Sequence, residues 1–140
     1  MATFVEVANG APIDEDVHLL RSFSADFILR QDDGTVRPAS RAFNLVPDQV
    51  TGQKAMSVYR TDYLDEDDVP YEAIVALHPD HLIVSHPAGI YVSLGLLLSA
   101  APEEGEVGRA HMHVIGLTGG RKNRLVQAVL EGPGAWVKGP

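Results

Sequence analysis

The sequence contains no cysteine among its 140 residues. Disulfide bonds, thiol nucleophiles and thiolate metal sites are therefore excluded, and any bound metal ion would need histidine or carboxylate ligands. Basic residues are also few, since 11 Lys and Arg stand against 19 Asp and Glu, which gives a formal net charge of -8. Because duplex nucleic acid and anionic membranes are bound through basic surfaces, the composition argues against both as partners.

Long hydrophobic runs are absent as well. The longest apolar stretch, residues 88–101, is too short to span a bilayer. Residues 1–17 lack the basic start and apolar core of a secretory signal, so a cytoplasmic location is expected. With 45% hydrophobic residues, the chain is expected to form one globular domain over residues 1–132, followed by a Gly- and Pro-rich tail over residues 133–140.

The order of apolar segments predicts a small α+β domain with a mostly antiparallel sheet and two or three helices. Acidic residues at the start of one segment, and Gly132-Pro133 after another, are typical of helix ends and predict helices over residues 12–23 and 121–132. A tight hairpin is expected at Asp33-Gly34. Residues 90–98 fit a helix or a strand. Strands are predicted at residues 3–8, 55–60, 73–77, 81–85 and 110–117.

Two histidines lie in the last of these strands, at positions 111 and 113. Side chains at positions i and i+2 of a strand share a face, so His111 and His113 should project together. Such a pair of imidazoles can begin a metal site or hold a phosphoryl group, with a third ligand from His78, His81 or His86. The alternative is that both are partly exposed polar residues on an edge strand.

A glycine pair and a basic residue, Gly119, Gly120 and Arg121, join this strand to the predicted helix. Glycine lets a ligand approach the backbone, and a helix start offers unpaired N–H groups and a partial positive charge. A phosphate or carboxylate could therefore be bound at this turn. The glycine spacings of Walker and dinucleotide-binding loops are absent, and a solvated β-to-α turn is the alternative.

A second possible anion site combines Arg37, Ser40 and Arg41 beside a proline that stiffens the turn. Two guanidinium groups and a hydroxyl could hold a carboxylate or phosphate by paired hydrogen bonds. Arg21 would join them if the helix predicted over residues 12–23 packs nearby. The interpretation that we favour is that these arginines pair with carboxylates of the same chain, such as those of Asp32 and Asp33.

The most acidic segment, residues 62–72, contains six carboxylates. The calcium-loop pattern is absent, so a solvated loop is expected, with a docking surface for a basic partner as the second interpretation. No nucleophile motif is present, because the serines lack a Gly-x-Ser-x-Gly elbow. Ser85 and His86 are neighbours on a predicted strand and should point to opposite faces, which argues against a catalytic pair.

Two short segments resemble fragments of the histidine-triad nucleotide hydrolases, whose motif alternates three histidines with apolar residues on a strand. They are "HLIV" at residues 81–84 and "HMHVI" at residues 111–115. The resemblance would place His111 and His113 at the last two histidine positions, which include the nucleophile. Arg109 stands where the first histidine of that motif should be, and the stretch between the two segments is short for the family.

A longer set of residues resembles a pattern in short uncharacterised prokaryotic proteins of accessory or defence type. That pattern combines an Arg-Pro-Ser-Ser-x-Ala-Phe-like motif, a Ser-Val pair and a C-terminal Ala-His-x-x-Val-x-Gly strand. The resemblance implies an accessory protein without an established activity, and it includes the first of the two histidines only. The matching residues are Arg37, Pro38, Ser40, Ala42, Phe43, Ser57, Val58, Ala110, His111, Val114 and Gly116.

The absence of a catalytic motif, the acidic composition and the longer resemblance lead to one hypothesis. Under this hypothesis, the chain is a small soluble binding or regulatory accessory protein of a prokaryotic system that acts through contact with a protein partner. The alternative is a phosphate-ester or nucleotide hydrolase or transferase. It would act on a phosphorylated small molecule through His111 and His113 with the turn at Gly119 to Arg121. Neither hypothesis requires a cofactor, and neither sets the oligomeric state.

Overall fold

The computed structural model describes residues 3–43, 46–47, 53–76, 78–131 and 136–139. Its main feature is an antiparallel sheet whose strands follow the order β11-β8-β3-β7-β10-β9, with β6 (Val46–Pro47) paired to β7. The other strands of this sheet are β3 (His18–Ser24), β7 (Lys54–Arg60), β8 (His81–Pro87), β9 (Leu97–Ala100), β10 (His111–Ile115) and β11 (Trp136–Lys138). The predicted α+β class is confirmed.

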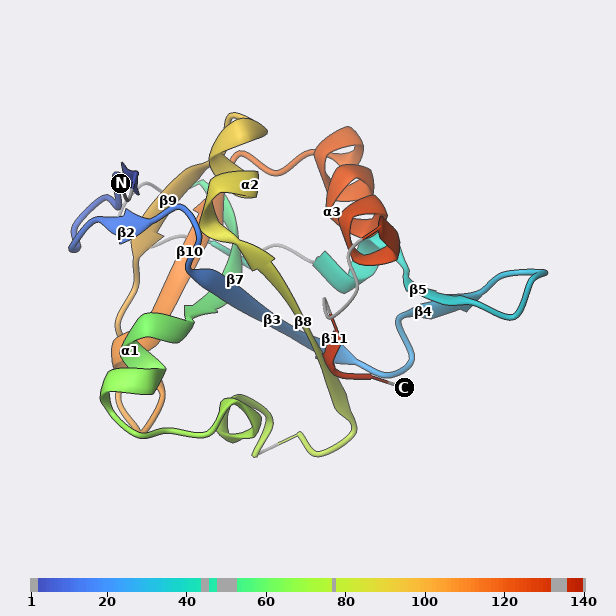
Figure 1. Ribbon diagram of the computed structural model, residues 1–140, viewed down its shortest axis with the longest axis horizontal. Coiled ribbons are helices and arrows are strands. Elements are labelled where there is room, and N and C mark those ends of the chain that lie inside the picture. Colours follow the sequence, from blue (N-terminus) through green and yellow to red (C-terminus); the bar gives the residue numbers. More distant parts are fainter. Residues whose placement is uncertain (1–2, 44–45, 48–52, 77, 132–135, 140) are drawn as a thin grey trace.

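Two small hairpins and three α-helices complete the domain. The hairpins are β1 (Phe4–Val5) with β2 (Ile13–Asp14), and β4 (Ile28–Arg30) with β5 (Val36–Pro38). The helices are α1 (Thr61–Glu66), α2 (Ala88–Ser93) and α3 (Gly119–Glu131), and single turns of 3₁₀ helix form η1 (Ser40–Phe43), η2 (Tyr71–Val75) and η3 (Gly108–Ala110). Figure 1 shows the β4–β5 hairpin projecting from the body of the molecule beside α3.

Apolar side chains on the two faces of the sheet form two separate cores. Leu19 and Phe23 of β3 join the larger core, which also contains Leu125 and Val126 of α3. Leu20, between them in the strand, joins a smaller core with Leu64 of α1 and Val75 of η2. This follows from the alternation of side chains along a strand. In Figure 1, α2 and α3 lie toward the top of the view and α1 toward the bottom, with β3 and β8 between them.

The helix predicted over residues 12–23 is wrong. This segment forms β2, a turn in which the Asp14 carboxylate accepts a hydrogen bond from the Asp16 N–H, and then most of β3. Both faces of β3 are covered by a core, so Leu19 and Leu20 are both fully buried. A strand with two covered faces loses its alternating pattern and can be mistaken for the apolar stripe of a helix.

Two further differences concern residues 73–77 and 90–98. The strand predicted over the first of these is wrong, because residues 73–75 belong to η2, which follows Pro70, and Ala76 ends that turn. Residue 77 lies outside the described residues. The second segment contains both of the elements that its pattern allowed. Helix α2 ends at Ser93, Gly95 turns the chain with a φ of 77°, and β9 starts at Leu97.

Most of the remaining predictions are confirmed. The strands at 55–60, 81–85 and 110–117 correspond to β7, β8 and β10, and the strand at 3–8 is present over Phe4–Val5 only. The hairpin at Asp33-Gly34 forms, with a φ of 86° at the glycine. Helix α3 begins at Gly119, two residues before its predicted start. The end of this helix, predicted at Gly132-Pro133, lies outside the described residues.

Part of the segment expected as a C-terminal tail joins the sheet. Residues Trp136–Lys138 form β11, which pairs with β8 at one edge. The Trp136 ring lies with its centroid 6.1 Å from that of Phe23, and so it packs against the larger core. In the described part of the chain, every helix is too short or too polar to cross a membrane.

Candidate functional site

The two histidines predicted as a site lie in the middle of the sheet. His111 and His113 belong to β10, which is hydrogen-bonded to β7 on one side and to β9 on the other. The two residues are 4% and 8% exposed, so the interpretation as partly exposed residues of an edge strand is wrong. They do share one face, as the spacing predicts, and their rings meet edge to face with centroids 5.2 Å apart.

The hydrogen bonds of His111 leave little room for chemistry at its Nδ1 atom. Nδ1 lies 2.6 Å from the Ala101 carbonyl oxygen and 3.0 Å from a carboxylate oxygen of Glu103. Because a carbonyl can only accept, Nδ1 carries the ring proton and donates it. Burial lowers the pKa of His111, which favours its neutral form. The ring is therefore held as a neutral donor by the residues that follow β9.

A third histidine ligand is not close to this pair. His78 and His81 stack on each other with centroids 4.7 Å apart, and His86 lies on the other face of the sheet in the larger core. Among the described residues, no three His, Asp or Glu side chains are grouped in a way that could hold a metal ion. The structure therefore offers no metal centre around His111 within the part of the chain that it describes.

The glycine turn and the histidine pair lie on opposite faces of the sheet. Met112 and Val114, which alternate with the histidines along β10, pack in the larger core together with residues of α3. The turn at Gly119, Gly120 and Arg121 starts α3 and so lies on that face, where Arg121 donates a hydrogen bond to the Gly116 carbonyl at 2.8 Å. The structure does not combine the two features into one phosphate site.

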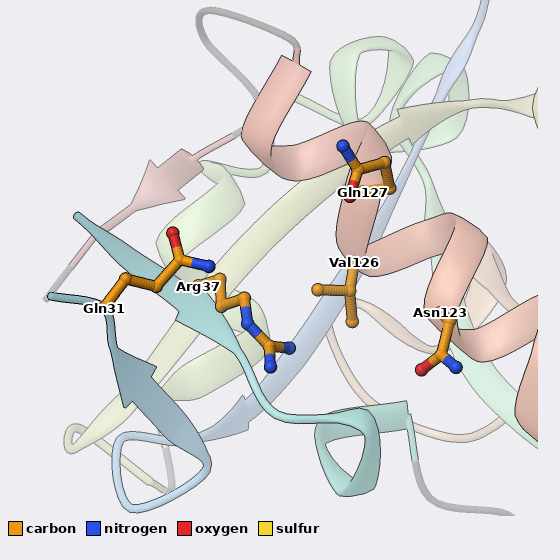
Figure 2. A pocket seen from close by; sticks show the side chains of 5 residues that line it. All are labelled: Gln31, Arg37, Asn123, Val126 and Gln127. Atoms are coloured by element: carbon orange, nitrogen blue, oxygen red, sulfur yellow. The ribbon is translucent and has the colours of Figure 1, made fainter. Parts of the chain in front are cut away.

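Arg37, in contrast, lies at a hollow. Figure 2 shows Gln31 and Arg37 from the β4–β5 hairpin facing Asn123, Val126 and Gln127 of α3 across a space of about 390 Å³. All of these residues except Val126 have polar ends, and the Arg37 side chain extends from β5 toward the helix. Amide groups both donate and accept hydrogen bonds, and a guanidinium donates in a planar fork, so the lining suits a polar, negatively charged ligand.

The interpretation that Arg37 pairs with nearby carboxylates is wrong for the described residues. Its guanidinium donates one long hydrogen bond, of 3.5 Å, to the Pro38 carbonyl, and no described carboxylate lies within ion-pair distance. The Asp33 carboxylate instead accepts hydrogen bonds from the N–H and hydroxyl of Thr35, which lower its pKa. The side chains of Ser40 and Arg41 lie outside the described residues.

Arg21 reaches the same segment but has a structural role. Its Nε donates to the Ala42 carbonyl at 3.0 Å and its Nη1 to the Ser57 carbonyl at 3.2 Å. Strands β3 and β7 pair only at Leu19–Arg60 and Leu20–Tyr59, so the guanidinium fills the place where the two strands part. Burial lowers the pKa of Arg21 to about 10. We therefore assign Arg21 to the sheet and not to the hollow.

The elements that border the hollow carry an excess of basic residues although the whole chain is acidic. Five of the 11 basic residues belong to β4, β5 and α3. The same elements and the turn of the hairpin contain three acidic residues, which are Asp32 and Asp33 at the tip of the hairpin and Glu131 at the end of α3. A second space, of about 380 Å³, lies on the other side of the helix, and Gln127 borders both spaces. The five basic residues are Arg30, Arg37, Arg121, Lys122 and Arg124.

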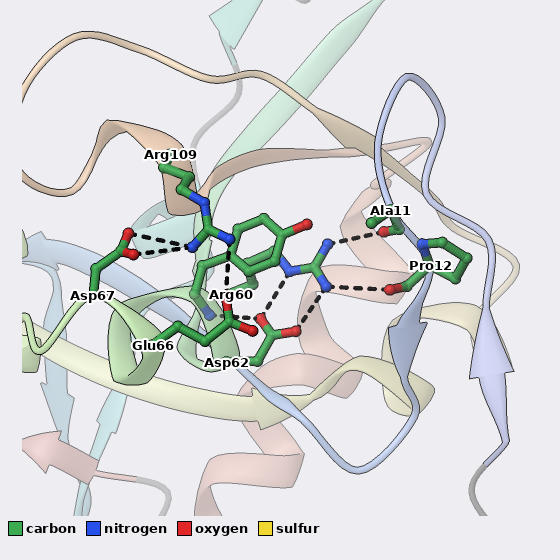
Figure 3. Close-up of polar contacts among 8 residues, drawn as sticks. Ala11, Pro12, Arg60, Asp62, Glu66, Asp67 and Arg109 are labelled. Atoms are coloured by element: carbon green, nitrogen blue, oxygen red, sulfur yellow. Dashed lines mark hydrogen bonds and ion pairs between the residues drawn. The ribbon is translucent and has the colours of Figure 1, made fainter.

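The acidic segment is not a simple loop, because its start belongs to α1 and its end to η2. Most of its carboxylate residues are nevertheless exposed, as expected of a solvated segment; they are Asp65, Glu66, Asp67, Asp68 and Glu72. Figure 3 shows Asp62 bound to Arg60, and Glu66 and Asp67 bound to Arg109. The Tyr63 ring lies between the two guanidinium groups, with each carbon Cζ 3.9 Å from the ring centroid. These contacts reduce the charge that the segment could offer to a basic partner.

Three residues at the Arg37 hollow were not found from the sequence: Gln31, Asn123 and Gln127. A signal was present for two of them, because positions 123 and 127 are one helical turn apart and share a face of the predicted helix. The sequence does not indicate that the hairpin lies against this helix. That contact depends on how β5 and η1 pack on α3.

Comparison with models of protein families, with curated proteins and with solved structures found no match to this chain. The two resemblances indicated by the sequence therefore stay predictions. The function must be inferred from the residues and their geometry.

Proposed function

We propose that this protein works by binding an acidic segment of a partner protein on the surface between the β4–β5 hairpin and α3. We name this the hairpin–helix surface and define it by Gln31, Arg37, Asn123, Val126 and Gln127. The observation that carries the proposal is the guanidinium of Arg37, which lies at a polar hollow without a carboxylate partner among the described residues.

Charge supports this choice of partner. A guanidinium that lacks a carboxylate partner can bind one from another molecule by two parallel hydrogen bonds. Arg124 is exposed on α3 and borders the second space on the other side of the helix, so its positive charge adds to the field of Arg37 from a longer range. The remaining surface of a chain with net charge -8 repels an acidic partner, so attraction is concentrated on this surface and orients the encounter.

The amide groups support a peptide as the binding group. Asn123 is exposed on α3, and Gln31 lies across the hollow from it, with its carbonyl oxygen accepting a hydrogen bond of 2.6 Å from the Thr35 hydroxyl and its amide nitrogen as the donor group. Carboxamides can pair with both the N–H and the C=O groups of an extended backbone. The exposed side chain of Leu29, on the same hairpin, adds an apolar contact at the rim.

The test is selection of peptides followed by affinity measurement. A display library of short random peptides is panned against the full chain, and the enriched peptides should be rich in Asp and Glu. We expect Arg37→Ala to weaken binding of the selected peptides at least tenfold, because a charge-assisted pair of hydrogen bonds contributes about 1.5–3 kcal/mol. Affinity is measured by fluorescence anisotropy at low and high salt, and should fall as salt rises.

Arg109→Ala is the matched control, because it removes the same charge from an exposed arginine outside the hairpin–helix surface. It should change the affinity less than twofold. The proposal is wrong if enriched peptides show no excess of acidic residues, or if the two variants bind them equally. It is also wrong if inorganic phosphate displaces the peptides more effectively than chloride at the same ionic strength, because the surface would then select small anions.

A further inference from the structure

A second polar hollow lies on the opposite face of the sheet, next to the smaller core. It measures about 350 Å³ and is bordered by Asp16, Val17, His18, Ser85 and other residues of β3, α1, η2 and β11. Its size falls in the range of small-molecule sites, about 300–1,000 Å³. Leu20, which belongs to the smaller core, forms part of the wall. This hollow shares no residue with the hairpin–helix surface, so an inference from it stands independently of the proposed function.

Within this hollow, a serine and a histidine are hydrogen-bonded. The Ser85 hydroxyl oxygen lies 2.9 Å from Nδ1 of His18. The two residues come from neighbouring antiparallel strands, since Ser85 is opposite Leu20 and His18 is opposite Pro87 in the register of β8 with β3. A distance of 2.9 Å is within reach for proton transfer from a hydroxyl to an imidazole.

The surroundings hold this pair in place while leaving the imidazole accessible. Ser85 is 7% exposed and its strand is paired on both sides, by β3 and by β11. The backbone of His18 is fixed by the Thr61 hydroxyl, which donates a hydrogen bond of 2.9 Å to the His18 carbonyl. The His18 side chain itself is exposed, so protons can exchange between its ring and water.

We propose that Ser85 is a nucleophile toward small carboxylic esters and that His18 is its general base. The Ser85 Oγ attacks the ester carbonyl carbon while its proton passes to Nδ1 of His18. The bond from the carbonyl carbon to the leaving alcohol then breaks, and His18 returns the proton to the alcohol oxygen. Water, deprotonated by His18, hydrolyses the resulting Ser85 ester, which releases the carboxylic acid and restores the hydroxyl.

The lining restricts the class of ester. Val17 and Val137 supply apolar wall in the same hollow, which suits a short aliphatic acyl group. Asp16 lies at the same hollow and would repel a negatively charged ester while favouring a neutral or cationic one. The substrate class is therefore a small ester without negative charge.

The experiment is labelling of the full chain with a small fluorophosphonate, which reacts with activated serine hydroxyls. Peptide mass spectrometry should place the adduct on Ser85, and a short neutral ester such as p-nitrophenyl acetate should give an acetyl group at the same residue. We expect His18→Gln to slow labelling at least tenfold, because general-base catalysis contributes roughly 10²–10⁴-fold.

Ser85→Ala should abolish the adduct, and Ser93→Ala is the matched control. The Ser93 hydroxyl donates to the Ile90 carbonyl and has no imidazole partner, so this variant should label like the original protein. Equal labelling rates with and without His18 would overturn the proposal. So would the absence of an adduct on Ser85 in the original protein, a result that needs no folded variant.

Discussion

Replacing Arg60 by alanine is expected to lower the free energy of unfolding by about 3 kcal/mol, because it breaks a buried ion pair. The Arg60 side chain is 4% exposed and binds the Asp62 carboxylate through two hydrogen bonds of 2.8 and 2.7 Å. It also donates to the carbonyls of Ala11 and Pro12 (Figure 3). Truncation would leave these acceptors without their donor and detach the β1–β2 hairpin from α1.

Arg109→Ala provides a comparison with an exposed arginine that binds carboxylates and the same aromatic ring but donates to no backbone carbonyl among the described contacts. Both guanidinium groups lie 3.9 Å from the centroid of the Tyr63 ring, and both bind carboxylates of α1 or the residue after it. The Arg109 side chain is 49% exposed, however, and its ion pairs are screened by water. Its loss should change stability much less than the loss of Arg60.

Urea unfolding at pH 7, followed by the fluorescence of the single tryptophan, measures both variants. A loss at Arg109 equal to that at Arg60 would show that the Tyr63 contact, and not burial of the charge, determines the effect. In that case Tyr63→Leu should reproduce both losses.

Acidification is expected to destabilise the protein because His86 is buried in its neutral form. The Nε2–H of His86 donates to the Leu125 carbonyl at 3.0 Å, and Nδ1 accepts from the Tyr91 hydroxyl at 3.3 Å. Burial lowers the pKa of His86 from its usual 6.5 to about 4. Because the folded pKa lies below the unfolded one, this stability is fully present above pH 6.5 and is lost as the pH falls toward 4. The full loss from this group is about 3 kcal/mol.

His86→Gln separates this contribution from that of the carboxylates. Glutamine can still donate to the Leu125 carbonyl but does not titrate, so the variant should lose less free energy of unfolding between pH 7 and pH 5 than the original protein does. Burial also lowers the pKa of His111, so a residual dependence on pH in the same direction should persist. The same pH dependence in both proteins would mean that His86 is not held neutral by the fold.

The predictions from sequence succeeded where local pattern and burial agree. Strand β10 is covered on both faces and bounded by turns. Helix α3 was predicted from the helical spacing of Leu125, Ala128 and Val129, and the larger core buries Leu125 together with Val126. The sequence predictions failed at β3, where Leu19 and Leu20 enter different cores and the alternation of apolar and polar residues disappears. The strand prediction for residues 73–77 failed for a related reason, because a run of β-branched and apolar residues also fits a 3₁₀ turn that packs over a core.

For the candidate sites, single residues were predictable but their neighbours were not. Arg37 was singled out for its guanidinium, yet Asn123 and Gln127 face it only because α3 packs beside the β4–β5 hairpin. The sequence analysis argued against a catalytic pair of Ser85 and His86, and the two side chains do point to opposite faces of the sheet. Its hydrogen-bond partner His18 is 67 residues away along the chain.

The amino-acid sequence by itself determined the α+β class, the absence of thiol chemistry, the acidic balance and the positions of β7, β8 and β10, because these depend on composition and on short-range periodicity. Only the tertiary structure decided which side chains meet. The pairing of β3 with β8 brings His18 to Ser85, and the face of the sheet on which α3 packs separates the histidines of β10 from the glycine turn. Contacts between distant segments depend on strand order and on which face is buried, and neither is encoded in any local stretch of sequence.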